Sequence, residues 1–141
     1  MPVTGVTVVS VPVSDQDRAK KFYTQTLGLK LLLDDDSMPG IRWVQVAPPT
    51  GGTALTLVTW FGSMPAGSLR GLVLTTDDLD RDCQRLRHLG AEFEQPPVQQ
   101  PWAREAVLRD PDGNQLVLQQ AEPAPARQAN SPAATLGNHP E

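Results

Sequence analysis

The sequence predicts an α+β protein in which one βαβββ module occurs twice. Segments rich in β-branched residues alternate with two helical segments, and each helical segment follows one strand and precedes three. Asp15 and Asp77 open the two helical segments, and Leu27-Gly28 and Leu89-Gly90 close them at the same separation. We interpret this repeat as an old duplication with drift.

The first module begins with a strand over residues 6–11. Ser14 is the expected N-cap of the helix that follows, and Gly28 is its expected end. The apolar face of this helix contains Ala19, Phe22, Tyr23 and Leu27. Strands are expected over residues 29–33, 41–47 and 53–60, the last two as a hairpin.

Residues 61–68 read as a linker, after which the order restarts with a strand over 69–75. Thr76 or Asp77 is the expected cap of the second helix. Its apolar stripe contains Leu79, Cys83, Leu86 and Leu89. A short strand over 91–94, an irregular crossing through three prolines and a closing hairpin of 102–109 with 115–120 complete the module.

We expect residues 1–120 to form one domain, with modules at about 4–60 and 69–120. Neither module alone buries enough apolar surface to be stable. Residues 121–141 are rich in proline and alanine and lack apolar periodicity, so a flexible tail is expected.

Composition restricts the function. Hydrophobic residues make up 39% of the 141 residues and charged residues 20%, which is typical of a soluble globular protein. A net charge of −4 argues against nucleic acid as a partner, and no apolar run approaches the ~20 residues of a membrane span. The N-terminus has no signal-peptide pattern, and the one cysteine cannot form an intramolecular disulfide. We therefore expect a cytoplasmic protein.

Four motifs occur in a characteristic order: Val13-Ser14-Asp15, Phe22-Tyr23, Leu27-Gly28 and the turn Asp110-Pro111-Asp112-Gly113-Asn114. Because these motifs occur in this order, the chain resembles the vicinal oxygen chelate superfamily over about residues 4–120. That superfamily includes glyoxalase I, the extradiol dioxygenases and the bleomycin-resistance proteins. The resemblance implies that the two sheets form an open, cup-shaped barrel and that two copies pair as a homodimer.

In metal-dependent members of this superfamily, four strands carry His or Glu ligands. The resemblance places these positions at Val8, Thr56, Gly71 and Val117, and no His, Asp or Glu lies within one residue of any of them. Valine and glycine side chains have no donor atom, so we predict no metal and no cofactor. His88 and His139 read as surface residues, and the acidic run 34–36 reads as a solvated turn rather than a chelator.

Without metal ligands, the cleft becomes an apolar cup. Trp102 is the best candidate for stacking on a flat ligand, although packing is the commoner role of each tryptophan. Arg104 is expected on the same face as Trp102, where it could bind an anionic or carbonyl group; a surface ion pair is the equal alternative. The predicted ligand-binding residues are Val8, Ser10, Trp43, Thr56, Trp60, Gly71, Trp102, Arg104 and Val117.

No nucleophile–base pair is visible, so no catalytic residue is assigned. Cys83 and Tyr23 lie on core-facing helical stripes, and Cys83 reads as a buried, inert thiol. The sequence favours a metal-independent protein that binds, and sequesters, an aromatic or hydrophobic metabolite or antibiotic. The alternatives are a glyoxalase-like lyase or dioxygenase acting on a small carbonyl or aromatic substrate, a metal-free enzyme using Arg104, and a dimerisation module.

Overall fold

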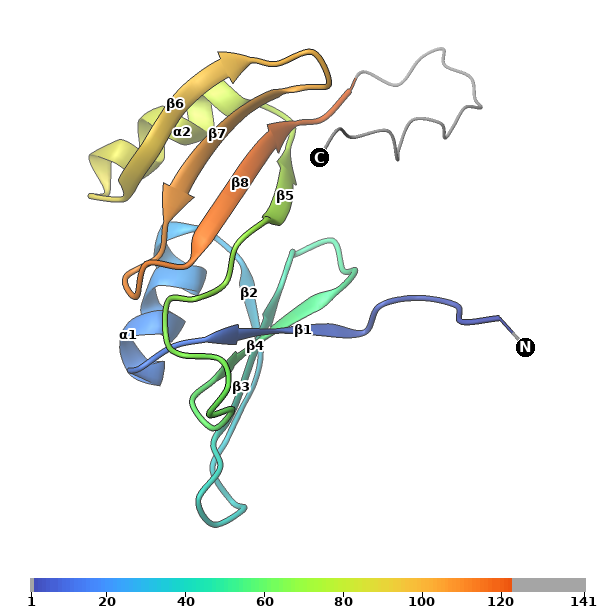
Figure 1. The fold of residues 1–141 in the computed structure, drawn as a ribbon, viewed down its shortest axis with the longest axis vertical. Helices are drawn as coiled ribbons and strands as arrows, with labels where there is room; N and C mark the ends of the chain where they lie inside the picture. Colours follow the sequence, from blue (N-terminus) through green and yellow to red (C-terminus); the bar gives the residue numbers. More distant parts are fainter. Residues whose placement is uncertain (1, 123–141) are drawn as a thin grey trace.

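The computed structural model describes residues 2–122, which form two modules, each with a four-stranded sheet (Figure 1). Most of the predicted C-terminal tail, residues 123–141, lies outside the described residues. No helix within 2–122 is long and apolar enough to cross a membrane.

The two modules have the same topology. The first contains β1 (Val8–Pro12), α1 (Gln16–Lys21), a π-helical turn η1 (Phe22–Thr26), β2 (Lys30–Asp35), β3 (Trp43–Ala47) and β4 (Ala54–Val58). The second contains β5 (Leu72–Thr76), α2 (Leu79–His88), β6 (Glu92–Gln99), β7 (Arg104–Arg109) and β8 (Gln115–Gln120). The strand orders are β1-β4-β3-β2 and β5-β8-β7-β6, and in each sheet the first strand runs parallel to the last one along the chain. The predicted α+β fold of two βαβββ modules is confirmed, and the sheets remain open.

Both helices begin at a residue other than the predicted cap. Asp15, not Ser14, caps α1, because its carboxylate accepts a hydrogen bond from the Arg18 amide at 3.0 Å. Asp78, not Thr76 or Asp77, caps α2 in the same way. The hydroxyl of Thr76 instead bonds the carboxylate of Asp82.

Strand β6 also differs from the prediction, since it continues through Pro96 and Pro97 to Gln99. It is an outer strand that pairs only with β7, so a proline there can leave its missing amide on the open edge. The register shifts between Phe93 and Gln95 and again between Gln95 and Val98, which absorbs the irregular backbone.

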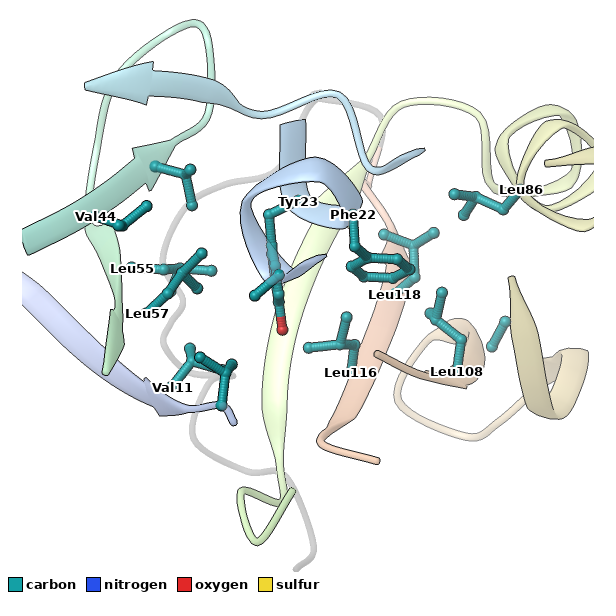
Figure 2. Close-up of a cluster of buried hydrophobic side chains, with 14 of the residues drawn as sticks. Val11, Phe22, Tyr23, Val44, Leu55, Leu57, Leu86, Leu108, Leu116 and Leu118 are labelled. Atoms are coloured by element: carbon teal, nitrogen blue, oxygen red, sulfur yellow. The ribbon is translucent and has the colours of Figure 1, made fainter. Parts of the chain in front are cut away.

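A single hydrophobic core lies between the modules. In Figure 2, Phe22 and Tyr23 lie between side chains of the first sheet, such as Leu57, and side chains of the second, such as Leu116 and Leu118. The rings of Phe22 and Tyr23 meet edge-to-face with centroids 5.1 Å apart. Full burial of each such side chain stabilises the fold by about 1.5–3 kcal/mol. The inner faces of both sheets are therefore directed toward this core, and their outer faces are directed away from it.

The second helix contributes fewer residues to this core than its predicted stripe. Leu79, Cys83 and Leu86 are buried, as expected. Leu89 is 50% exposed, because it lies just beyond the last residue of α2.

The turn between β7 and β8 joins the two modules. Asp110 is buried, and its Oδ2 accepts hydrogen bonds from the Tyr23 hydroxyl at 2.7 Å and from Asn114 Nδ2 at 2.8 Å. Asn114 also donates to the Pro12 carbonyl at 2.8 Å. Burial, followed by the charge of Asp110, raises the pKa of Tyr23 far above its usual range, so its hydroxyl remains a donor.

Candidate ligand-binding site

We call the side of the first sheet that is turned away from the core the first outer face. Strand register places Ser10 and Gln45 on either side of Thr56, and the Gln45 amide donates to the Thr56 hydroxyl at 3.3 Å. Val8 shares this side of β1 by alternation. Its neighbours Val9 and Val11 belong to the core region. The first outer face is thus apolar at one end and carries a small polar pair at its centre.

Two predicted tryptophans meet at the edge of the first outer face. Trp43 begins β3, and Trp60 lies two residues beyond the end of β4. Their rings meet edge-to-face with centroids 5.1 Å apart, and Phe61 lies 6.1 Å from Trp60. These aromatic rings stabilise one another, and they also provide flat apolar surface beside the sheet.

The corresponding side of the second sheet is the second outer face. Val117 pairs with Val73 on one side and Val107 on the other, so three valines form its centre. Gly71 lies directly before β5 with a φ of 80°, and its amide donates to the Gln115 side chain at 2.9 Å.

A polar cluster borders these valines. Glu105 is only 9% exposed and pairs across the sheet with Gln119, which places both on the second outer face. Glu105 Oε1 accepts hydrogen bonds from Trp102 Nε1 at 3.2 Å and from Gln119 Nε2 at 3.0 Å. Glu105 is not among the residues predicted from the sequence. Period-two alternation along β7, starting from Val107 or Arg109, could have indicated it.

Arg104 does not share a face with Trp102 and Glu105. It follows the alternation of Ala106 and Leu108, which point into the core, and its guanidinium binds the Asp80 carboxylate of α2 at 2.7 Å. The hydrogen bond to Asp80 raises the pKa of Arg104. The ion-pair alternative is therefore the one found, and the expected placement beside Trp102 is wrong.

The four positions implied by the resemblance do not meet within one chain. Val8 and Thr56 belong to the first sheet, whereas Gly71 and Val117 belong to the second. Because the core lies between the inner faces of the sheets, the two outer faces are separate candidate half-sites. Within a single chain the neighbours of Val117 are Val73 and Val107 rather than Val8.

The donor atoms on both outer faces do not suit the metal ion of metal-dependent relatives. Within residues 2–122, no three His, Cys, Asp or Glu side chains are grouped so that they could hold a metal ion. The acidic run is engaged elsewhere: Asp34 binds Arg42 at 2.9 Å and Lys20 at 2.7 Å. These two cations hold the pKa of Asp34 well below its usual range.

A cavity lies elsewhere, between the two modules. Its volume is about 600 Å³, and its walls come mainly from residues 27–29 before β2, the β3–β4 turn, β5 and α2. None of the nine predicted ligand-binding residues lines it, and no aromatic side chain does. Two of its three charged groups have partners, since Arg85 donates to the Thr26 carbonyl and Asp82 accepts from Thr76. No sequence pattern indicates this cavity, because it depends on how the modules pack.

Two modules of the same βαβββ topology, packed around one shared core, define the class of α+β fold of this chain. The chain belongs to the Glyoxalase/Bleomycin resistance protein/Dioxygenase superfamily, whose profile matches residues 5–118.

Three relatives illustrate the range of this family. TnmS3, an antibiotic binding protein from Streptomyces sp. CB03234, is 50% identical; the match covers 86% of this chain and 99% of that chain, with a TM-score of 0.81. YetH of Bacillus subtilis is 30% identical over 121 residues, covering 84% of this chain and 99% of YetH. The lactoylglutathione lyase of Salmonella typhimurium is 30% identical over 120 residues, covering 79% of this chain and 89% of the lyase.

Proposed function

We propose that this protein binds an aromatic or hydrophobic metabolite or antibiotic on its outer faces, without a metal ion, and thereby sequesters it in the cytoplasm. The observation that carries the proposal is the chemistry of the four positions Val8, Thr56, Gly71 and Val117. They offer three groups without a donor atom and one hydroxyl, where a metal-dependent relative needs His or Glu. The description of TnmS3 as an antibiotic binding protein supports it.

We further propose that two copies pair so that the first outer face of one meets the second outer face of the other. The open edges of β1 and β5 support this pairing, because neither strand carries a charged residue that would oppose strand addition. Val8 on β1 is 40% exposed and Val73 on β5 is 45% exposed. Such a homodimer would combine the two half-sites into a complete cup.

The alternative is a glyoxalase-like lyase or dioxygenase acting on a small carbonyl or aromatic substrate, favoured by the similarity to lactoylglutathione lyase. Such chemistry relies on a Lewis acid to stabilise an enediolate or to bind oxygen. The residues at the four mapped positions do not fit a metal ion, so they support no catalytic step of this kind.

Two measurements test the proposal together. A thermal-shift screen with flat aromatic compounds should find a ligand that stabilises the protein, by about 2.7 kcal/mol when the ligand is at a hundredfold excess over its Kd. Elemental analysis of the dialysed protein should find no stoichiometric divalent metal. Retained metal at one ion per chain would contradict metal-independent binding and favour the enzyme.

A further inference from the structure

The second outer face contains a carboxylate that forms no ion pair with any cation among residues 2–122. Glu105 is 9% exposed, and none of the ion pairs among residues 2–122 includes it. Its two hydrogen-bond donors, Trp102 Nε1 and Gln119 Nε2, are both neutral and both reach the same oxygen, Oε1. A buried carboxylate without a counter-charge is costly to the fold.

The surroundings of Glu105 match a small, flat molecule. Val107 and Val117 lie next to it on the same face, and the Trp102 ring is 38% exposed beside it. Gln95 pairs with Val107 on this face, and its buried amide Nε2 has no hydrogen-bond partner within residues 2–122. The face thus combines an apolar floor, an aromatic wall, an anionic acceptor and an unused donor.

We propose that Glu105 is the polar anchor of the ligand site and that the ligand is an aromatic molecule bearing a cationic N–H group. This inference rests on the proposed binding function and adds the class of ligand. The ring system would lie on Val107 and Val117 against Trp102, while its N–H group would bind the Glu105 carboxylate. Trp102 and Gln119 hold that carboxylate in place through Oε1.

The test compares two probes of nearly the same shape, 9-aminoacridine and acridine, by fluorescence titration at pH 8. The first is a cation with N–H donors at this pH, and the second is neutral. A charge-assisted hydrogen bond is worth about a 10- to 100-fold change in affinity, so the wild type should bind 9-aminoacridine more tightly by about that factor. Glu105→Gln should abolish the difference by weakening the binding of 9-aminoacridine.

Glu92→Gln is the matched control. Glu92 is an exposed carboxylate on β6 that pairs with Arg109 on the same face, so its removal changes the net charge equally. This variant should keep the preference for 9-aminoacridine. Trp102→Phe, which keeps a ring but removes the donor to Glu105, should reduce that preference without abolishing it.

The melting temperature of Glu105→Gln distinguishes a binding role of Glu105 from a purely structural role. A structural role would make this variant melt earlier than the wild type. Glu105→Gln retains an oxygen that can accept from Trp102 and Gln119, so its melting temperature should equal or exceed that of the wild type. A Glu105→Gln variant that melts earlier yet still prefers 9-aminoacridine would overturn the inference. If the wild type binds both probes equally, the inference about Glu105 is overturned, but the proposed binding function is not. Failure to bind either probe, together with no hit among flat aromatic compounds, would overturn the proposed function as well.

Discussion

Tyr23, the second residue of the Phe22-Tyr23 motif, links the two modules through a hydrogen bond. It is the only tyrosine of the chain, and its hydroxyl crosses from the first module to Asp110 in the second. Its position on the apolar helical stripe predicted burial in the core but no polar role. Its partner lies 87 residues away, so no local pattern could reveal the bond.

Tyr23→Phe should destabilise the protein by about 1–3 kcal/mol, because it leaves a buried carboxylate with one donor fewer. Chemical denaturation measures this change. Thr24→Val is the control, because it also removes a hydroxyl group. The Thr24 hydroxyl donates to the Lys20 carbonyl within its own helical segment, at 2.8 Å, and does not bridge the modules. This variant should cost less than about 1 kcal/mol. Equal losses in both variants would show that the Tyr23–Asp110 bond does not hold the modules together.

Asp34 should make stability depend on pH. Its hydrogen bonds to Arg42 and Lys20 lower its pKa in the folded state relative to about 3.9 in the unfolded chain. The resulting stabilisation is fully present above the unfolded pKa and is lost as the pH falls through the lower folded pKa. Because solvent screens these pairs, the effect should be about 1 kcal/mol or less.

Asp34→Asn should therefore be less stable than the wild type at pH 7, and the difference should shrink as the pH falls from about 4 to 2, as measured by urea denaturation at each pH. Asp36→Asn, at an exposed neighbour in the same run, serves as the control. A difference between wild type and Asp34→Asn that persists unchanged at pH 2 would contradict the ion-pair explanation.

At the scale of elements, the segment between β4 and β5 contacts both modules and helps to hold the two sheets in their relative position. Gly67 donates its amide to the Pro12 carbonyl at 3.1 Å and has a φ of 84°. A Cβ atom at this position would collide with the carbonyl oxygen of Asp112 in the β7–β8 turn. The segment was predicted as a linker, but it contacts both modules.

Gly67→Ala should destabilise the protein by about 2–4 kcal/mol, because backbone strain and the collision add. Gly40→Ala is the control, since Gly40 has a similar φ of 81° but open space around its Cα. It should cost only about 1–2 kcal/mol from strain. Thermal and chemical unfolding of both variants would measure the difference. Equal costs would show that the Asp112 carbonyl moves aside easily.

At the scale of the whole molecule, the proposed cup requires two copies. Sedimentation should find a dimer at micromolar concentration, and Val73→Lys should convert it to a monomer by placing a charge at the open edge of β5. Leu89→Lys is the control, because Leu89 is 50% exposed just beyond α2 and lies on neither open edge. A monomeric wild type would remove the basis for a cup formed between copies.

The sequence by itself determined the fold class, because hydrophobic periodicity, caps and turn residues act over a few neighbouring residues. The duplicated element order and the apolar helical stripes at Ala19, Phe22, Cys83 and Leu86 were predictable for this reason. Alternation along β1 places Ser10 on the same face as Val8, whereas the pairing of Ser10 with Thr56 is seen only in the sheet.

The tertiary structure alone decided how the modules face each other, and with it the nature of the site. The core between the sheets separates Val8 from Val117, and the ion pair with Asp80 directs Arg104 away from Trp102. These outcomes depend on contacts between residues far apart in sequence, whose free energies no local pattern encodes. The buried Glu105 became visible as a candidate anchor only when its neighbours across the sheet were known.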